Sequence, residues 1–402
     1  MRRQTSANQQ AELQQTLRRC EKNGQGAALL LVDLDKFKDI NDLHGHPAGD
    51  AVIRVTAERL LNACRGSDTV ARLGGDEFAI IQTSISFANQ AEDMAHRLVA
   101  ILSEPVNCGH GLIVKPGASI GVAMIAAGQS EEQIVSNADI ALYNAKSAGR
   151  QTYCLFRKGM GAEVRQRREM EKDLNAALAD DQFELYFQPR LNLATGNIVS
   201  YEALIRWNHP DHGLVSPVEF IPVAENSGQI IGIGKFVLER ALAVAAQEIP
   251  TGNISLNVSP VQFRDKDFIE DVARAIKASG IPANRIELEI TENTLIEDDA
   301  RALSILTKLK DIGVKIALDD FGVGYSSLSY LSRFPFDCIK IDRSFVLEAQ
   351  QNYNALAIIE AVVRLGKALD MRIVAEGLED TENLCLLAAQ GCHEVQGYLI
   401  GK

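Results

Sequence analysis

The sequence lacks the features of a secreted or membrane-embedded chain. Its seven cysteines are scattered and form no C-x-x-C pair, a distribution that fits a reducing compartment. No stretch reaches the roughly 18 consecutive apolar residues that a membrane-spanning helix needs, and the polar start of the chain has no signal-peptide core. We therefore expect a cytoplasmic protein with no membrane span in this segment, and a sensory or membrane region upstream remains open.

An excess of positive charge is also missing. The formal net charge is −12, whereas proteins that bind long nucleic acids are usually basic. A small phosphorylated ligand is still compatible with an acidic chain, because bulk charge is screened within about 8–10 Å and local lysines, arginines or metal ions suffice. We therefore expect no long nucleic acid among the partners.

The order of apolar and polar residues predicts two domains of different architecture. Residues 1–156 mix strand and helix patterns with a hairpin at Gly74-Gly75, which indicates an α+β domain. The charged segment 157–180 has a helical pattern and is interpreted as a linker helix. From residue 181 to 402, strand patterns alternate with helical ones, which is typical of a (β/α)8 barrel. The eight strand candidates are 183–188, 197–205, 252–258, 285–291, 314–319, 338–342, 371–376 and 392–398.

Polar side chains recur in or just after these apolar strand candidates. They are Glu202, Asn257, Glu289, Glu292, Asp319, Asp320, Lys340, Asp342, Glu376 and Gln396. A charge inside an apolar strand is unfavourable unless it is paired or bound to a metal. A strand-end cap or an ion pair is an alternative for any single residue, but the whole set indicates one shared site at the barrel rim. Its oxygen-rich composition favours Mg²⁺ or Mn²⁺ over zinc, and the adjacent Asp319 and Asp320 can serve two ions.

Nine sequence segments, found in order, give this half of the chain a family resemblance. They are YFQPRL, YEALIRW, FIPVAE, LNVSPVQF, ELEITEN, DDFGVGYSSLSYL, IKIDRSF, AEGLE and QGYLIGK. Residues 181–402 resemble the EAL domain of cyclic di-GMP phosphodiesterases. The resemblance implies a TIM-like barrel whose first strand is reversed, and metal-dependent hydrolysis of cyclic di-GMP to linear pGpG.

The resemblance also implies how the polar residues of the barrel divide their roles. The ligands of a first metal ion are Glu202, Asn257, Glu289 and Asp319. Asp320 belongs mainly to a second ion, and Lys340 contacts the attacking water. Glu376 and Gln396 complete the shell around the ions.

Three further residues of the barrel have implied roles outside the metal shell. Gln188 and Arg206 contact the dinucleotide, since the guanidinium fork of an arginine suits a phosphate or a guanine edge. Glu292 braces the loop from Asp320 to Ser327 rather than touching metal.

Three carboxylates of the first domain also lie at predicted strand ends. Asp33 closes an apolar strand, and Asp76 and Glu77 follow the Gly74-Gly75 turn. Carboxylates in this arrangement can hold two Mg²⁺ ions over a triphosphate, and glycine lets a ligand approach the backbone closely. Nearby positive charge is supplied by Lys36, Lys38, Lys146 and Arg150.

A second family resemblance covers this part of the chain. The segments that carry it are LLLVDLDKFKDIND, GHPAGD, TVARLGGDEFAII, ASIGVA and ADIALYNAKSAGR. Residues 10–155 resemble the GGDEF domain of diguanylate cyclases. The resemblance implies a polymerase-palm-like fold that joins two GTP molecules into cyclic di-GMP. Because each domain holds one GTP, catalysis would need two chains face to face, and we expect a homodimer.

The GGDEF resemblance assigns roles to the charged residues of the first domain. Asp33 and Glu77 would bind metal, with Asp76 acting at the same site. Asn41 and Asp50 would bind guanine, whose N1 and N2 donors suit a carboxylate. The phosphate contacts would come from Lys38, Lys146 and Arg150.

An R-x-x-D segment precedes the double glycine. Arg65 and Asp68 match in register the product-inhibition site of the GGDEF family. The alternative is an exposed arginine and a turn aspartate after the preceding helix. The register favours the inhibitory interpretation.

Three positions depart from the family patterns. Asn226 stands where EAL domains often have a second acid after the Ala-Glu of FIPVAE. The sequence ends at Lys402, where the family continues with a proline and a final helix, so we expect a truncated EAL domain. Residues 4–9 are at best a remnant of the D-x-L-T-G-L-x-N-R motif that opens GGDEF domains.

Three functions are compatible with these features. The first is a bifunctional enzyme that makes and cleaves cyclic di-GMP. The second is a phosphodiesterase whose GGDEF domain only binds GTP and regulates. The third is a non-catalytic receptor for cyclic di-GMP, which predicts missing metal ligands, whereas the ligand positions above are all filled.

Overall fold

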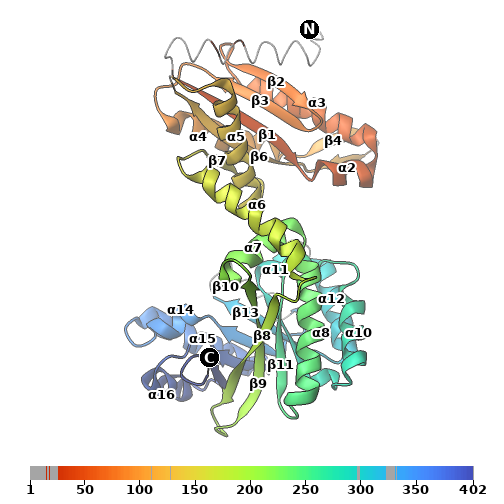
Figure 1. The fold of residues 1–402 in the computed structure, drawn as a ribbon, viewed down its shortest axis with the longest axis vertical. Coiled ribbons are helices and arrows are strands. Elements are labelled where there is room, and N and C mark those ends of the chain that lie inside the picture. Colours follow the sequence, from red (N-terminus) through yellow and green to blue (C-terminus); the bar gives the residue numbers. More distant parts are fainter. Residues whose placement is uncertain are drawn as a thin grey trace. The chain divides into compact units, whose positions relative to one another are not determined.

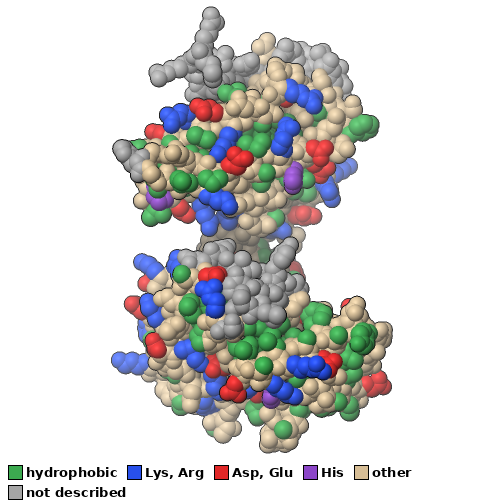
Figure 2. Space-filling model, turned by 180° about the vertical axis from the view of Figure 1, so that it is seen from behind, with side chains coloured by type: hydrophobic (Ala, Val, Ile, Leu, Met, Phe, Trp, Pro, Cys, Tyr) green, Lys and Arg blue, Asp and Glu red, His purple; other side chains and the backbone are tan. Residues whose placement is uncertain are grey.

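The computed structural model describes residues 26–109, 111–126, 128–296, 299–322 and 333–401, together with residues 15, 18 and 331. The chain forms two compact units, Met1–Glu169 and Met170–Lys402 (Figure 1). None of the described helices is long and apolar enough to cross a bilayer. On the face drawn in Figure 2, acidic and basic side chains are interspersed over both units.

The first unit is built on a five-stranded sheet in the order β2-β3-β1-β6-β7. Its strands are β1 (Ala27–Asp35), β2 (Thr69–Gly74), β3 (Glu77–Gln82), β6 (Gly117–Ile125) and β7 (Tyr153–Leu155). The central strand β1 runs antiparallel to β3 and β6, and each of its residues is buried. A separate pair, β4 (Val106–Gly109) and β5 (Leu112–Val114), was not predicted, because strands this short carry little periodic signal.

Side-chain alternation along β1 divides the core of this unit between two helical layers. The helices are α2 (Phe37–His44), α3 (His46–Ala63), α4 (Ala88–Leu102) and α5 (Glu131–Ser147). Even-numbered residues from Ala28 to Leu34 pack with α3 and α4, and odd-numbered residues from Ala27 to Leu31 pack with α5. Asp33 continues the odd-numbered series, so its side chain leaves β1 on the α5 face. The sheet, its helices and the β2–β3 hairpin confirm the predicted α+β fold.

A helix, α6 (Met160–Ala177), occupies most of the segment predicted as a linker, and the two units divide within it. Its C-terminal residues Leu174 and Ala177 are buried with Phe183 and Trp207 of the second unit. The charged residues between them and the start of the helix are mostly exposed.

The second unit is a closed barrel. Its sheet has the order β10-β9-β11-β12-β13-β14-β15-β16-β8, and an additional pairing of β8 with β9 closes it. The strands are β8 (Phe183–Asn192), β9 (Ile198–His209), β10 (Gly213–Val215), β11 (Asn253–Val258), β12 (Ile286–Thr291), β13 (Lys315–Phe321), β14 (Cys338–Ile341), β15 (Arg372–Ala375) and β16 (Glu394–Gln396). β8 is antiparallel to both β9 and β16, while β9 and β11 through β16 are parallel. The predicted barrel with a reversed first strand is therefore confirmed, and β10 is a short addition that the sequence did not predict.

Helices cover the outside of the barrel (Figure 1). They are α7 (Pro217–Ser227), α8 (Ile230–Glu248), α9 (Pro260–Phe263), α10 (Phe268–Ser279), α11 (Asn293–Ile296), α12 (Asp299–Ile312), α14 (Arg343–Glu348), α15 (Tyr353–Ala368), α16 (Thr381–Gln390) and the 3₁₀ turn η1 (Ala283–Arg285). The helices pack on one set of alternating strand residues, such as Ile286, Leu288 and Ile290 of β12. The intervening residues, Glu287 and Glu289, consequently point into the barrel.

The same alternation places polar groups inside the barrel on several strands. In β14, Ile339 and Ile341 belong to the outer core, so Lys340 points inward. In β13, Leu318 faces outward and Asp319 inward by the same rule. The strand pattern by itself thus delivers the carboxylates and the lysine to the barrel interior.

Candidate functional site

Lys340 lies at the centre of a group of carboxylates inside the barrel. Its side chain is 1% exposed, and its Nζ lies 2.5 Å from Glu289 Oε2 and 2.5 Å from Glu376 Oε1. The same nitrogen is 3.3 Å from Asp319 Oδ1 and 3.6 Å from Glu202 Oε2. Four acidic side chains from four strands or strand ends therefore converge on one ammonium group.

Two amide side chains orient Glu202. Asn257 Nδ2 donates to Glu202 Oε1 at 2.6 Å, and Gln396 Nε2 donates to Glu202 Oε2 at 2.6 Å. Gln396 Nε2 also donates to Gln188 Oε1 at 2.9 Å, and Gln188 Nε2 donates to the carbonyl of Gly401 at 3.0 Å. The predicted site residues of β8, β9, β11 and β16 are thus joined in one hydrogen-bonded chain.

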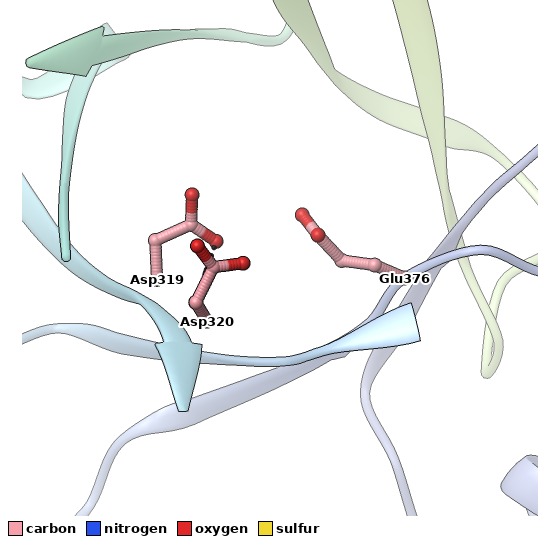
Figure 3. A group of neighbouring side chains, drawn as sticks. All are labelled: Asp319, Asp320 and Glu376. Atoms are coloured by element: carbon pink, nitrogen blue, oxygen red, sulfur yellow. Dashed lines mark hydrogen bonds between the residues drawn. The ribbon is translucent and has the colours of Figure 1, made fainter. Parts of the chain in front are cut away.

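Asp319, Asp320 and Glu376 form a tight acidic cluster at the mouth of this interior. Each offers a carboxylate oxygen, and these oxygens lie within 4.8 Å of one another. Figure 3 shows the carboxyl group of Glu376 pointing toward those of Asp319 and Asp320. Sequence reasoning gave Glu376 a role in completing the shell around the ions, and the structure places one of its carboxylate oxygens within 4.8 Å of those of both aspartates.

Neighbouring strand residues normally point to opposite faces, so Asp319 and Asp320 need an irregular backbone to share one site. Asp320 has a left-handed backbone with φ +54°, and the pairing of β13 with β14 shifts register between Leu318 and Phe321. The Asp320 N–H donates to Asp319 Oδ1 at 3.0 Å. Aspartate tolerates this conformation better than most side chains, and irregular backbone of this kind often occurs at functional sites.

The electrostatics of the interior follow from burial and from mutual repulsion. Burial raises the pKa of Glu289 well above its usual value, and the negative charge of Glu202 raises it further. Burial likewise raises the pKa of Glu376 to about 8, although Lys340 opposes the shift. Burial also tends to raise the pKa of Glu202, but Lys340 and the two amide donors have the larger combined effect and lower it. The negative charge that these carboxyl groups can carry thus exceeds the positive charge of the one lysine among them. Divalent cations bind to such groups of carboxylates, and their binding releases the protons.

The donor set fits a hard divalent cation. Every group described around Lys340 offers oxygen, from carboxylates or from the Asn257 amide, and oxygen ligands suit Mg²⁺ or Mn²⁺. Glu202 and Asn257 are in direct contact, and Lys340 joins Glu202 to Glu289 and Asp319. The four residues predicted to bind the first ion therefore lie around one point.

The predicted dinucleotide contacts lie beside this group. Gln188 is the Cα partner of Glu202 in the β8–β9 ladder. Arg206 is half-buried, with its guanidinium carbon 5.1 Å from the ring centre of Tyr186 and its Nη1 donating to the carbonyl of Ile205 at 2.9 Å. A cavity of about 290 Å³ next to them is lined by Arg206, Asn257 and apolar residues of β9, α7 and α8. Its mostly apolar wall is suited to a planar base.

Glu292 and Asn226 are the two remaining predicted features of the barrel. Glu292 is buried, but most of the loop that it was predicted to brace, residues 323–327, lies outside the described residues. Asn226 donates to the carbonyl of Pro222 in its own helix at 2.9 Å, whereas Glu225 accepts from Ser259 Oγ at 2.7 Å. The departure at Asn226 therefore falls on a side chain that bonds to its own helix.

The first unit brings its three predicted carboxylates to one corner of the sheet. Asp33 and Glu77 are Cα partners in the β1–β3 ladder, and Asp76 is in the turn before β3. Lys146, in the last turn of α5, reaches Asp33 Oδ2 at 2.7 Å. Burial raises the pKa of Asp33, Lys146 opposes that shift, and Asp76 adds to it. This corner resembles the barrel site in combining crowded carboxylates with one lysine.

Arg72, which sequence reasoning missed, fixes the tip of the hairpin. Its Nε and Nη2 donate to the carbonyl of Gly75 at 3.1 and 2.6 Å. Gly75 has φ +49° and open space around it, so the exposed Gly74-Gly75 backbone is accessible to a ligand. The signal in the sequence was an arginine two residues before the double glycine.

The predicted guanine-binding residues lie on two helices that touch. A Cβ added to Gly49 would lie 2.0 Å from Asn41 Oδ1, so the glycine leaves room on α3 for the Asn41 side chain next to the residue that precedes Asp50. Asp50 lines a cavity of about 600 Å³ together with Arg54 and Phe78. The guanine role of this pair remains a prediction.

The remaining cations of the first unit are less closely grouped. Lys38 is exposed on α2, and Arg150 follows α5 with a left-handed backbone of φ +64°. Within the described residues, Lys146 is the predicted phosphate-binding cation that contacts Asp33. The phosphate roles of Lys38 and Arg150 remain predictions.

Asp68 of the R-x-x-D segment has a clear local role. Its two carboxylate oxygens accept from the backbone N–H groups of Arg65 at 2.9 Å and Thr83 at 3.1 Å. Asp68 therefore holds the turn after α3 against the end of β3, as the alternative interpretation predicted. The Arg65 side chain is exposed, and its inhibitory role remains a prediction.

Comparison with known proteins identifies both units. The family model described as the EAL domain matches residues 171–402, and the one described as the diguanylate cyclase GGDEF domain matches residues 6–152. The chain belongs to the tandem GGDEF–EAL proteins. Its relatives include an uncharacterized signaling protein of Caulobacter vibrioides, 42% identical over 98% of this chain and 49% of that protein.

Further GGDEF–EAL relatives have descriptive names. One is the bifunctional diguanylate cyclase/cyclic di-GMP phosphodiesterase MucR of Pseudomonas aeruginosa, 38% identical over 97% of this chain and 57% of that protein. A solved structure titled as the PaMucR phosphodiesterase in complex with c-di-GMP superposes with a TM-score of 0.57 and 38% identity. It covers 58% of this chain and 96% of the solved chain. The present chain thus spans about half the length of the curated relatives it matches.

Proposed function

We propose that the EAL barrel hydrolyses cyclic di-GMP to linear pGpG with the help of two Mg²⁺ or Mn²⁺ ions. The observation that carries the proposal is the convergence of Glu202, Glu289, Asp319 and Glu376 on the buried Lys340. The names of MucR and of its cyclic di-GMP complex support the same substrate.

In this proposal each residue acts through the contacts that it makes in the barrel. Glu202, Asn257, Glu289 and Asp319 would hold the first ion, and Asp320, with Glu376 nearby, would hold the second. Such ions, when bound, would supply polarisation of a phosphate and a lowered pKa for a bound water. Lys340 keeps a positive charge beside that water, because four surrounding carboxylates raise the pKa of its ammonium group against the effect of burial.

The remaining barrel residues would bind the dinucleotide and keep it in place. Asn257 and Gln396 lock both oxygens of Glu202, and Gln396 links that residue to Gln188. Arg206 presents its guanidinium beside the apolar cavity, where it can contact a phosphate or a guanine edge. Glu292 would brace the loop after Asp320.

The direct test uses the purified chain with cyclic di-GMP and Mg²⁺. We expect pGpG as the product by chromatography, and loss of at least about 100-fold in rate for Glu202→Ala, because a lost metal ligand removes transition-state stabilisation. Glu248→Ala is a matched control, since this exposed carboxylate ends α8 outside the barrel. Absence of pGpG with both Mg²⁺ and Mn²⁺ would falsify the proposal and favour a receptor for cyclic di-GMP.

A second activity is favoured by the corner of the first unit. The pairing of Asp33 with Glu77, together with Asp76 and Lys146, provides carboxylates and a cation beside an open Gly74-Gly75 backbone. The GGDEF unit would therefore join two GTP molecules into cyclic di-GMP, with two chains face to face as a homodimer. The alternative is a GGDEF unit that binds GTP only to regulate the barrel.

The two alternatives differ in whether GTP is consumed. An active barrel would hydrolyse whatever the GGDEF unit forms, so Glu202→Ala should accumulate cyclic di-GMP from GTP and Mg²⁺. Adding Glu77→Ala to that variant should abolish the product, because the proposed metal ligand at the start of β3 is lost. GTP binding without any cyclic di-GMP in the Glu202→Ala variant would establish the regulatory alternative instead.

A further inference from the structure

The reversed strand β8 carries a fully buried arginine to which the phosphodiesterase proposal assigns no role. Arg190 has a side-chain exposure of 0%. Because β8 runs opposite to its neighbours, Gln188 lies beside Glu202 near the mouth, and Arg190 lies one step deeper, opposite Ser200. A buried guanidinium depends on nearby acceptors for its charge, and the two Nη groups of Arg190 are the ones that have them, so their contacts show what this arginine organises.

Arg190 connects the proposed metal site around Lys340, here called the metal-type site, to a second group of charged side chains deeper in the barrel. Its Nη1 donates to Glu287 Oε1 at 2.7 Å and lies 3.5 Å from Glu394 Oε2. Its Nη2 donates to Ser255 Oγ at 2.7 Å and to Glu289 Oε1 at 3.0 Å. One side of the guanidinium fork thus holds the deeper carboxylates, and the other reaches a predicted metal ligand.

The deeper charges are balanced without Glu289. Arg372 contacts Glu287 through Nη2 and donates from Nη1 to Glu394 Oε1 at 3.2 Å. We call Glu287, Glu394 and Arg372 the lower ion layer. Together with Arg190 they make two cations and two carboxylates, so their charges balance. Arg190 is therefore anchored by charges that do not belong to the metal-type site.

Glu289 is held by a different cation at each oxygen. Its Oε1 accepts from Arg190, and its Oε2 lies 2.5 Å from Lys340 Nζ on the side of the acidic group. Because Oε1 is turned toward Arg190, deeper in the barrel, Oε2 is the oxygen that faces the carboxylates around Lys340. The orientation of this carboxylate is consequently decided by an arginine 99 positions away in the sequence.

We propose that Arg190 is a positioning residue that makes Glu289 present a single oxygen to the first metal ion. This inference rests on the proposed phosphodiesterase function and adds a residue to it. The geometry needs an arginine, because its two Nη groups point to two layers, whereas the single ammonium of lysine can serve one. Outer contacts that orient metal ligands typically change metal affinity by roughly 10–100-fold when they are lost.

The test compares Arg190→Lys with Arg372→Lys. Both substitutions retain a positive charge and touch the same lower ion layer, but only Arg190 contacts Glu289. Mn²⁺ binding is measured by electron paramagnetic resonance without nucleotide, in a background carrying Asp33→Ala and Glu77→Ala so that the first unit does not contribute. We expect an affinity about 10–100-fold weaker for Arg190→Lys and within about twofold of the parent for Arg372→Lys.

A double-mutant cycle with Glu289→Gln provides the second measurement. Glu289→Gln alone should weaken Mn²⁺ binding, and adding Arg190→Lys should weaken it no further, because the arginine acts only through that carboxylate. Unfolding in urea is measured in parallel to show whether each variant folds. If Arg190→Lys does not fold, Arg190→Gln is used in its place.

The outcomes separate this inference from the proposal on which it rests. If the parent forms pGpG and binds Mn²⁺ but Arg190→Lys binds Mn²⁺ like the parent, the positioning role is wrong and the phosphodiesterase stands. Independent, additive effects of Arg190→Lys and Glu289→Gln would also overturn it. A parent that neither binds Mn²⁺ nor forms pGpG contradicts both proposals.

Discussion

Asp320 shows at the scale of one residue how the backbone builds the acidic cluster. Its left-handed conformation, with φ +54°, turns its carboxylate to the side of Asp319 and Glu376. For a residue with a Cβ this conformation is less stable than the right-handed one by roughly 1–2 kcal/mol. Burial raises the pKa of Asp320, and the negative charge of Asp319 raises it further. The two neighbouring carboxylates therefore repel each other when both are ionised.

The strain at Asp320 can be separated from its chemistry by two substitutions. Asp320→Ala and Asp320→Gly should both lose hydrolysis of cyclic di-GMP, because each removes the carboxylate. The glycine variant should be more stable than the alanine variant by about 1 kcal/mol, since glycine adopts positive φ without a clash. Urea unfolding followed by fluorescence measures the difference. The single tryptophan, Trp207, is buried between the barrel wall and the helices that cover it, so it reports the second unit.

Asp319 provides the control for this comparison. It lies in β13 without a positive φ, so there the order should reverse and Asp319→Gly should be the less stable variant. Equal stabilities for the two Asp320 variants would show that the left-handed backbone stores no strain.

At the scale of elements, β12 supplies both the metal-type site and the charges that support it. Its outward residues are apolar, and its inward residues Glu287 and Glu289 differ in their surroundings. Arg190 and Arg372 overcome the effect of burial and lower the pKa of Glu287 to about 2. For Glu289, the effect of burial and of Glu202 prevails, and its pKa is raised well above the usual value. The pKa values of two glutamates that lie two residues apart on one strand are therefore shifted in opposite directions.

The shift at Glu287 predicts how barrel stability depends on pH. Its folded-state pKa of about 2 lies below the ordinary 4.5, so its stabilising contribution is complete above about pH 4.5 and is lost as the pH falls toward 2. The difference corresponds to about 3 kcal/mol at neutral pH. Glu287→Gln should therefore lower the free energy of unfolding markedly at pH 7 and much less near pH 3.

Trp207 fluorescence in urea at both pH values measures this effect. Glu248→Gln, at an exposed position on α8, should change barrel stability little at either pH. A loss for Glu287→Gln that is the same at pH 7 and pH 3 would mean that the arginines do not hold the ionised carboxylate.

At the scale of the whole molecule, the chain consists of two units, each with its own core and its own group of carboxylates. The described cysteines, Cys64, Cys108, Cys154, Cys338, Cys385 and Cys392, are all free thiols. Their exposure differs widely, since Cys385 is exposed on α16 while Cys338 and Cys392 are buried. Burial raises the pKa of Cys392 to about 12.

Alkylation should distinguish these thiols in the folded protein. Reaction requires an accessible thiolate, so iodoacetamide at pH 8 should modify Cys385 quickly and leave Cys338 and Cys392 unmodified until the chain is unfolded. Mass spectrometry of peptides before and after addition of urea measures the three sites. Rapid modification of Cys392 in the native protein would contradict the packing described here.

The sequence predicted the strands of the barrel well because parallel strands covered by helices are strongly apolar and are marked by polar residues at their ends. It did not predict β4, β5 and β10, which have only three or four residues each and carry almost no periodic signal. The reversal of β8 followed from the family resemblance rather than from any pattern within the strand. Its consequence, an arginine one layer below Gln188, became visible only with the pairing of β8 and β9.

The sequence by itself determined which donors are available and on which strands they lie, because residue type and alternation are local properties of the chain. Only the tertiary structure decided which atoms meet. The gathering of carboxylates around Lys340, the shared carboxylate of Glu289 and the turn at Asp320 depend on barrel closure and on a register shift. These contacts join residues 51, 99 and more positions apart, and no local periodicity can specify such distant partners.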